Sequence, residues 1–220
     1  MRKIALGLVL LWAFVFAGDD IITRKIDSDC KNGDNRSCYA LALNYFNGNN
    51  GFSRDLGKAK FYFGRICRKG NENGGFFGEA CFYLGVMYDD YGFGDQQDSK
   101  KALEFYTLAC DEGNAGACAS IGTIYNDGKG VSKDVAKGAS YFKKACDLGQ
   151  LMSCYIFANH ALKNKDVGKA SQYFNKACEL GKSDPKQVRN DSNVKEVWEL
   201  ACNQKMILDL LQEAEAMPKN

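Results

Sequence analysis

Apolar side chains recur along this chain at helical spacing, and cysteines mark the points where one helical stripe ends and another begins. After each of four cysteines, a large apolar residue lies three positions on and Ala or Gly lies four positions on. Counted from Cys38, Cys81, Cys118 and Cys154, these residues are Leu41 and Ala42, Leu84 and Gly85, Ile121 and Gly122, and Phe157 and Ala158. Residues three and four apart share one face of an α-helix, so each stretch predicts an amphipathic helix, named helix A.

A second stripe, named helix B, precedes another set of cysteines. Aromatic residues lie five and four positions before each of these cysteines, and Ala or Gly lies eight positions before. The aromatic pairs before Cys67, Cys110, Cys146 and Cys178 are Tyr62 and Phe63, Phe105 and Tyr106, Tyr141 and Phe142, and Tyr173 and Phe174. A glycine three positions after each cysteine predicts the left-handed residue that ends a helix. These glycines are Gly70, Gly113, Gly149 and Gly181.

The spacing of equivalent positions indicates that helices A and B form one repeating unit. Cys110 and Cys146 are 36 residues apart, as are Cys118 and Cys154. A single helical hairpin cannot bury its own apolar face, so neighbouring hairpins must stack. The pattern therefore predicts an all-α protein, an α/α superhelical solenoid. Its four units cover residues 38–80, 81–117, 118–153 and 154–190, and together they form the domain 38–190.

Both ends of the array depart from the pattern, as capping segments do. Residues 18–37 predict an N-terminal capping helix. Residues 191–220 predict a C-terminal capping helix and tail, and Pro185 separates them from the last helix B because proline does not continue a helix. The residues expected to cover the open end of the core are Trp198, Leu200, Ala201, Met206, Ile207, Leu208, Leu210 and Leu211.

The first 17 residues have the pattern of a secretory signal peptide. Arg2 and Lys3 precede an apolar run over residues 4–16, with a cleavage site near Ala17 or Gly18. The run is too short to span the ~30 Å hydrocarbon core of a bilayer. We therefore expect residues 1–17 to be removed and the mature protein to be secreted or periplasmic, with no membrane attachment.

Charge and cysteine content agree with an exported, disulfide-bonded protein. Without Arg2 and Lys3, the 29 basic residues become 27, equal to the 27 acidic residues, and such a neutral chain predicts no nucleic-acid partner. The ten cysteines are an even number, as a disulfide framework requires. Three neighbouring pairs share a spacing of eight residues across one kind of turn, so the repeat predicts bonds between neighbours. The predicted bonds are Cys30–Cys38, Cys67–Cys81, Cys110–Cys118, Cys146–Cys154 and Cys178–Cys202.

No group of residues in the sequence indicates a metal, a cofactor or a catalytic centre. His160 is the single histidine, the cysteine spacing is too wide for zinc, and C-x-x-C is absent. Ser-x-x-Lys, the nucleophile motif of serine β-lactamases, begins at Ser28, Ser140, Ser183 and Ser192. Its partner motifs Ser-Asp-Asn and Lys-Thr-Gly do not occur. We therefore predict no catalytic residue, no metal and no cofactor.

The pattern Leu84-Gly85-x-x-Tyr88, followed by Lys101-Ala102-x-x-Phe105-Tyr106-x-x-Ala109-Cys110, resembles the Sel1-like repeat, a relative of the tetratricopeptide repeat. Together with the joint from Lys144 to Cys154 and the signal peptide, it looks like the secreted Helicobacter cysteine-rich protein family. That resemblance implies proteins catalogued as β-lactamases, which bind or slowly hydrolyse penicillins, and which also engage host or envelope partners.

Two functions follow as hypotheses. The first is an exported repeat protein that binds a peptide or protein on the concave face lined by A helices. Its candidate contacts are the polar residues Asn44, Thr123, Asn126 and Asn159. The second, implied by the resemblance, is a β-lactamase that hydrolyses the β-lactam amide as its primary activity. A β-lactam or a peptidoglycan-like small molecule would then occupy the same groove. In both cases we expect a monomer.

Overall fold

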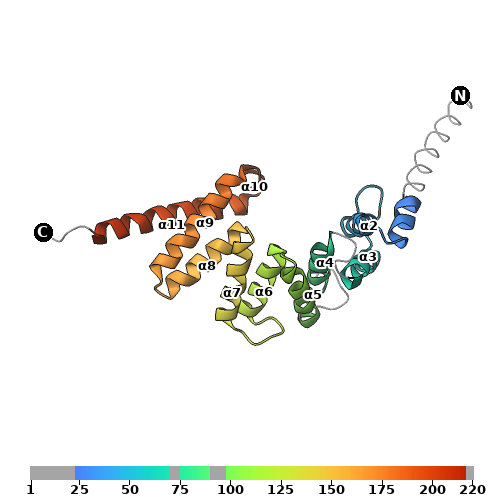
Figure 1. Ribbon diagram of the computed structural model, residues 1–220, viewed down its shortest axis with the longest axis horizontal. Coiled ribbons are helices and arrows are strands. Elements are labelled where there is room, and N and C mark those ends of the chain that lie inside the picture. The colour runs from blue at the N-terminus through green and yellow to red at the C-terminus, as the bar shows by residue number, and fades with distance from the viewer. Residues whose placement is uncertain (1–22, 70–74, 90–97, 217–220) are drawn as a thin grey trace, which may run out of the picture. The chain divides into compact units, whose positions relative to one another are not determined.

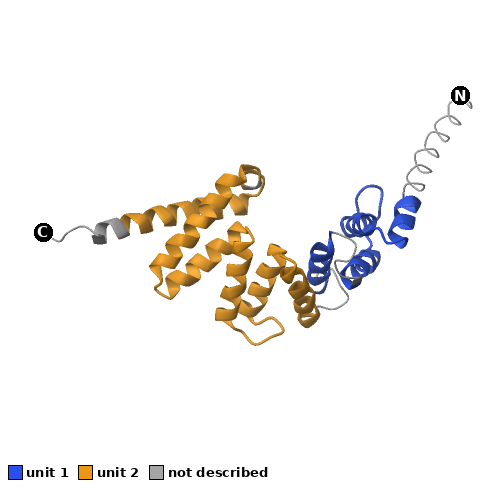
Figure 2. Cartoon of the chain, in the orientation of Figure 1, with its two compact units in different colours: residues 1–97 blue, residues 98–220 orange. Residues whose placement is uncertain are grey.

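The computed structural model describes residues 23–69, 75–89 and 98–216, and every regular element in these ranges is an α-helix. This confirms the all-α fold predicted from the hydrophobic pattern. The predicted signal peptide, residues 1–17, lies outside the described residues, as does Gly70. The chain divides into two compact units, residues 1–97 (unit 1) and residues 98–220 (unit 2), shown in Figure 2.

Unit 1 contains part of the N-terminal capping helix and three helices of the repeat. The repeat helices are α2 (Asn35–Asn47), α3 (Leu56–Lys69) and α4 (Phe77–Asp89). α3 packs against both α2 and α4. The described part of the capping helix covers residues 23–31, inside the predicted cap 18–37, and residues 18–22 lie outside the described residues. Two hydrogen bonds attach it to α3: Tyr62 Oη donates to Asp27 Oδ1, and Arg65 Nη2 donates to the Lys31 carbonyl, each at 2.7 Å.

Unit 2 contains the remaining repeats and the C-terminal helices. They are α5 (Ser99–Asp111), α6 (Ala115–Asp127), α7 (Val135–Asp147), α8 (Leu151–Lys163), α9 (Val167–Ser183), α10 (Pro185–Asn190) and α11 (Ser192–Ala216). From α5 to α9, each helix packs against the next one along the chain, and α11 packs against α9 and α8 (Figure 1). The A helices are thus α2, α4, α6 and α8, and the B helices are α3, α5, α7 and α9.

The core of each hairpin consists of the two predicted stripes. The aromatic residue four positions before each B-helix cysteine is buried: Phe63, Tyr106, Phe142 and Phe174. Gly122 shows why the facing position on helix A is small. A Cβ atom there would lie 2.9 Å from the Phe142 ring, well inside the ~3.5 Å at which carbon atoms begin to repel. A small residue on helix A therefore allows the aromatic ring of helix B to approach the α6 backbone.

Each B helix begins at an aspartate, a feature that was not predicted from the sequence. In α7, the Asp134 carboxylate accepts a hydrogen bond from the Lys137 backbone N–H at 2.8 Å. The same bond occurs at three other helices, between Asp55 and Lys58, Asp98 and Lys101, and Asp166 and Lys169. Such an N-cap contributes about 1 kcal/mol because it satisfies a backbone N–H that has no partner in the helix. The recurring Asp-x-x-Lys pattern carried this information.

Disulfide bonds connect the capping helix to α2, each of α3, α5 and α7 to the helix that follows it, and α9 to α11. The bonded pairs are Cys30–Cys38, Cys67–Cys81, Cys110–Cys118, Cys146–Cys154 and Cys178–Cys202, the same pairs that the repeat predicts. Their Cα atoms lie 4.6 to 5.1 Å apart. The described residues include no free cysteine.

The predicted helix-ending glycine is confirmed at Gly113 and Gly149, which have φ angles of 87° and 93°. At Gly149, the N–H of the following Gln150 donates to the Ala145 carbonyl, so the turn satisfies a carbonyl at the end of α7. A residue with a side chain adopts this backbone conformation only with strain. The turn then leads into α8 within three residues.

The same prediction is wrong at Gly181. This glycine lies inside α9, which continues to Ser183. A Cβ atom at Gly181 would overlap the Trp198 ring of α11. Glycine is required here because a ring from another helix occupies the space of its side chain, and no reversal of the chain is involved.

The C-terminal cap differs from the prediction in how its apolar residues divide. Ala201 and Leu208 of α11 are buried against the core of unit 2, and Trp198 packs against it. The other predicted core residues are exposed: Leu200, Met206, Ile207, Leu210 and Leu211. Adjacent residues point about 100° apart around a helix, so a nearly continuous apolar run cannot face one side only.

Candidate binding surface

One face of the A helices in unit 2 lies outside the core and is named the A-helix outer face. It consists of the residues two, five and nine positions after the second cysteine of a joint: Ser120, Thr123 and Asp127 on α6, and Ile156, Asn159 and Lys163 on α8. All six are exposed or half-buried, whereas Gly122 and Ala158, four positions after the cysteine, are buried. The face therefore offers hydroxyl, amide, charged and apolar groups on two rigid helices.

Two of the predicted contact residues belong to this face, and each bonds within its own helix. Thr123 Oγ1 donates to the Ala119 carbonyl at 3.2 Å, and Asn159 Nδ2 donates to the Tyr155 carbonyl at 3.0 Å. The Asn159 amide oxygen and the lone pairs of the Thr123 hydroxyl oxygen retain capacity to accept hydrogen bonds. Both side chains can therefore take part in recognition without breaking a helix.

The other two predicted contacts lie elsewhere. Asn126 borders the contact between α6 and α7, because a Cβ atom at Gly138 would lie 3.1 Å from the Asn126 backbone nitrogen. Its side-chain amide donates to Asp127 Oδ1 at 3.0 Å. Asn44 is in unit 1, where its Oδ1 accepts from Asn50 Nδ2 at 2.8 Å and orders the loop after α2. No hydrogen bond links any two of the four predicted contacts.

Aromatic side chains gather on the A helices of unit 1, a feature that was not predicted from the sequence. Tyr39 of α2 stacks on Phe76 with ring centroids 4.7 Å apart and lies 6.3 Å from the Tyr83 ring of α4. Burial raises the pKa of Tyr39 to about 12, so its hydroxyl stays protonated at neutral pH. The cluster places successive A helices side by side within unit 1.

Ser140 and Lys143, one Ser-x-x-Lys pair, lie on α7 without forming a catalytic unit. Ser140 Oγ donates to the Lys137 carbonyl at 2.7 Å, and Lys143 Nζ pairs with Asp147 Oδ2 at 2.7 Å. The hydrogen bond to Asp147 holds the pKa of Lys143 above its usual value. A lysine that keeps its proton cannot remove one from a serine hydroxyl.

The other candidate groups are also engaged in local contacts. Lys31 pairs with Asp27 at 2.6 Å, and Ser183 Oγ donates to the Leu180 carbonyl at 2.7 Å. The His160 ring lies within 3.2 Å of the Asn164 side-chain amide and stacks on Phe157. Within residues 23–69, 75–89 and 98–216, no group of three or more His, Cys, Asp or Glu residues could hold a metal ion.

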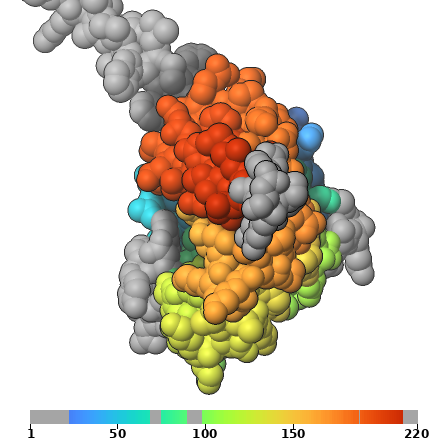
Figure 3. Space-filling view, turned by 90° about the vertical axis from the view of Figure 1, so that its left-hand side faces the viewer, coloured from blue at the N-terminus to red at the C-terminus, as the bar shows by residue number. Residues whose placement is uncertain are grey.

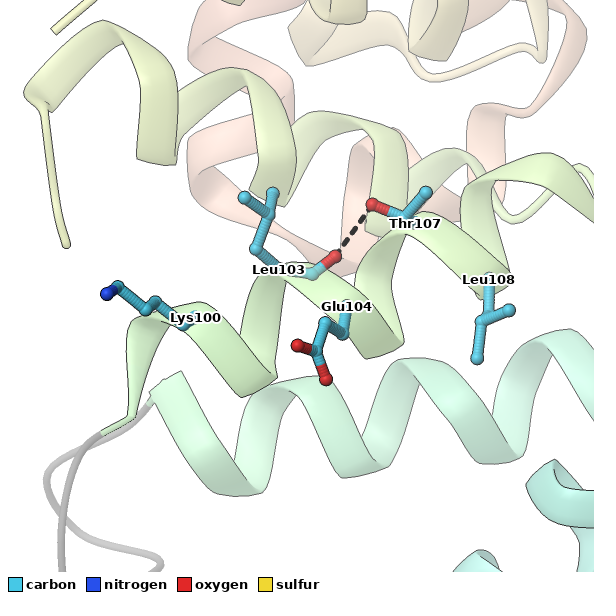
Figure 4. A pocket seen from close by; sticks show the side chains of 5 residues that line it. All are labelled: Lys100, Leu103, Glu104, Thr107 and Leu108. Carbon is cyan, nitrogen blue, oxygen red and sulfur yellow. Dashed lines mark hydrogen bonds between the residues drawn. The ribbon is translucent and has the colours of Figure 1, made fainter. Parts of the chain in front are cut away.

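A shallow depression of about 620 Å³ lies over α5 (Figure 4). The side chains lining it are Lys100, Leu103, Glu104, Thr107 and Leu108. Thr107 Oγ1 donates to the Leu103 carbonyl at 2.7 Å, so the hydroxyl is tied to its own helix. A single carboxylate with no paired base gives this depression no evident chemistry.

Among the described helices, none combines the length and apolarity of a membrane span.

Comparisons with known proteins agree with this architecture. The family model described as "Sel1 repeat" matches residues 35–71, 78–114, 115–150 and 162–182, more than half of the chain. Cytochrome c oxidase assembly factor 7 of Xenopus tropicalis is 33% identical over 132 residues, which are 59% of this chain and 55% of that protein. The chain thus spans about half the length of this curated relative.

Two solved structures are similar to this chain. The protective antigen c5321 of uropathogenic Escherichia coli superposes with a TM-score of 0.63 at 23% identity, over 74% of this chain and 34% of that chain. This similarity extends to the fold alone. Cysteine rich protein B of Helicobacter pylori is 31% identical, over 58% of this chain and 90% of that chain, with a TM-score of 0.43.

Proposed function

Because the chain belongs to the Sel1 repeat family, we propose that it is an exported scaffold that binds a peptide or protein partner on its A-helix outer face. The proposal rests on one combined observation: the A helices are held in place by covalent bonds and core packing, and side chains on their outer face are exposed to solvent. Disulfide bonds and buried aromatic residues fix α6 and α8, and Thr123, Ile156 and Asn159 remain available to solvent. Stacked helical repeats bind extended partners on such a surface.

Export is the second part of the proposal, and the disulfide bonds support it. Bonds of this kind persist in oxidising compartments, and the five in this chain are consistent with one. The apolar run over residues 4–16 supplies the export signal. Intact mass measurement of the protein from its native source should give a chain that begins near Gly18, and a chain that retains Arg2 and Lys3 would contradict export by this route.

The curated relative is named as a cytochrome c oxidase assembly factor. That name supports a partner-binding role for the present chain, which spans about half of the relative. We therefore propose a protein or peptide as the partner in preference to a small molecule.

A peptide selection with matched variants tests this function. Peptides selected from a random library on the oxidised mature chain should bind with micromolar affinity. Thr123→Arg and Asn159→Arg should each weaken binding by about tenfold or more, equivalent to ~1.4 kcal/mol. Ser140→Arg, on an exposed face of helix B, is the control and should leave binding unchanged. Equal losses in all three variants would contradict binding at the A-helix outer face.

The alternative function is β-lactam hydrolysis, and one experiment separates it from binding alone. The oxidised chain should neither hydrolyse a chromogenic β-lactam nor form a covalent adduct with penicillin, because the Ser140 hydroxyl and the Lys143 ammonium are held in separate contacts. Turnover that is lost in Ser140→Ala, or an adduct mapped by mass spectrometry, would establish the enzyme instead. A β-lactam that binds without turnover would indicate that the chain binds a small molecule without catalysing its hydrolysis.

A further inference from the structure

Helix α11 has apolar side chains on two opposite faces. One face includes Ala201 and Leu208 and packs in the core of unit 2. The other face, named the α11 stripe, consists of Leu200, Met206, Ile207, Leu210 and Leu211. These five residues are 39% to 58% exposed. With 3.6 residues per turn, they fall on one arc of about 140°. Met206, Ile207, Leu210 and Leu211 form a continuous apolar patch on it, and Asn203 lies between this patch and Leu200.

Two residues of the α11 stripe occupy positions at which α6 contacts the helix B that follows it. Cys202 of α11 bonds to a helix B, as Cys118 of α6 does, and the two cysteines therefore set a common register. Four and eight positions after Cys118, Gly122 and Asn126 contact α7. The corresponding residues of α11 are Met206 and Leu210, and they are exposed. α11 thus contacts the preceding helix B, α9, as an A helix does, but within the described residues no following helix B covers Met206 and Leu210.

We propose that the α11 stripe pairs with the α11 stripe of a second copy of this chain, with the two helices antiparallel. The spacing of the stripe is self-complementary. A two-fold axis between residues 208 and 209 places Met206 opposite Leu211 of the second copy, and Ile207 opposite Leu210. These four apolar side chains of the α11 stripe then meet one another across the axis, as an isologous interface requires. The paired helices fill the place that helix B takes in a complete unit.

Charge favours this occupant. The α11 stripe has no ionisable residue, and the neighbouring Lys205 and Asp209 neutralise one another at 2.8 Å. The chain has a formal net charge of +2, which falls to zero when Arg2 and Lys3 are removed, so two copies do not repel one another at long range. This pairing replaces the monomer expected from the sequence.

The shape of unit 2 leaves α11 accessible. Its C-terminal part continues beyond the ends of α8 and α9 (Figure 1), and it contributes to the surface in the space-filling view (Figure 3). The α11 stripe and the A-helix outer face lie on different helices, so the pairing does not depend on the proposed partner.

Sedimentation equilibrium of the oxidised mature chain tests the proposal. The wild-type protein should show a reversible monomer-dimer equilibrium. Ile207→Glu and Leu210→Glu should each weaken association by about tenfold or more, the effect of ~1.4 kcal/mol, because a charge would face an apolar partner. Val135→Glu and Leu148→Glu are matched controls at apolar residues of unit 2 that are 41% and 42% exposed, and they should leave association unchanged. Circular dichroism verifies that each variant is folded.

Cross-linking tests the direction of the helices separately. In a mixture of Ile207→Cys and Leu210→Cys chains, a thiol-specific cross-linker should join the two variants more efficiently than it joins either variant to itself. Preferential joining within the Ile207→Cys sample would indicate parallel helices and overturn the antiparallel arrangement. A wild-type chain that stays monomeric at all concentrations would overturn the pairing. Binding of such a monomer to phospholipid vesicles or to an amphipathic peptide would assign the surface to that partner.

Discussion

Two disulfide joints in unit 2 show which features of the repeat are constant and which can change. The Cys146–Cys154 joint connects α7 to α8 across eight residues, and the Cys178–Cys202 joint connects α9 to α11 across 24. Their Cα atoms are 4.6 and 4.9 Å apart, so the longer joint closes to nearly the same separation. The two cysteines are therefore brought almost equally close in the two joints, although the chain between them differs in length.

The third residue after the cysteine has opposite roles in the two joints. Gly149 reverses the chain with a φ of 93°, and a Cβ atom added to it would have no other atom within 4 Å. Gly181 stays helical, and the space beside it is filled by the Trp198 ring, whose Nε1 donates to the Cys178 carbonyl at 3.0 Å. Glycine is needed for its backbone freedom at the first joint and for its empty space at the second.

Removing the two disulfide bonds should give the largest difference between the joints. Restriction of the unfolded chain predicts a loss of about 3.5 kcal/mol for Cys178→Ala/Cys202→Ala and about 2.5 kcal/mol for Cys146→Ala/Cys154→Ala, because the stabilisation grows with loop length. Urea denaturation of each variant, with the other bonds oxidised, measures both. Non-reducing peptide mapping of the wild type should join Cys178 to Cys202. A larger loss at the shorter loop would contradict this ordering.

Substituting the two glycines should give the next largest losses of stability. Gly181→Ala should destabilise the fold by about 1–3 kcal/mol, because the new methyl group would overlap the Trp198 ring. Gly149→Ala should cost about 1–2 kcal/mol, the penalty for a left-handed residue with a side chain. Thermal or urea denaturation gives both values.

A double substitution separates the two causes. In a Trp198→Ala background, Gly181→Ala should no longer destabilise and should gain up to ~1 kcal/mol from helix propensity. The effect of Gly149→Ala should be the same with and without Trp198. If Gly181→Ala were equally destabilising in both backgrounds, crowding by Trp198 would not be the reason for the glycine.

The repeat could be predicted from the sequence because its determining contacts recur at fixed local positions. Gly122 and Phe142 belong to stripes that repeat with the cysteines, and the disulfide pairs follow from the same register. The role of Gly181 could not be predicted in this way, because the ring that fills its space comes from Trp198, outside the repeat. The exposure of Ile207 and Leu210 was missed for a related reason. An apolar run shows that a helix has apolar residues but does not show how many of its faces are covered.

The candidate surface was predictable only in part. Thr123 and Asn159 could be placed on the outer face from their spacing relative to the core positions. Asn126 has the same polar character, but it lies beside Gly138, where the absent side chain lets α7 approach. Polarity alone therefore did not distinguish a surface contact from a residue at a helix-helix boundary.

Removing the charge of the residue that follows the first cysteine of each joint should give the smallest difference in stability between the two joints. Asp147 accepts hydrogen bonds from Lys143 of its own helix and from Lys176 of α9, each at 2.7 Å. Glu179, the equivalent residue of the last joint, forms its ion pair within α9, with Lys182 at 2.8 Å, and acts on Lys205 of α11 only through a longer-range charge interaction. Burial raises the pKa of Asp147, but the hydrogen bonds from the two lysines outweigh it and the net pKa is lowered.

The sign of the pH dependence follows from that lowered pKa. A carboxyl group whose pKa is lower in the folded state stabilises the fold above its unfolded value of about 3.9, and this contribution disappears as the pH falls through the folded value. Asp147→Asn should therefore destabilise the protein at neutral pH by about 0.2–1 kcal/mol, and the difference from the wild type should vanish in acid. Glu179→Gln should have a smaller effect, since its ion pair joins no second helix. Urea denaturation at a series of pH values measures both variants, and an undiminished Asp147→Asn effect in acid would exclude the ion pair as its cause.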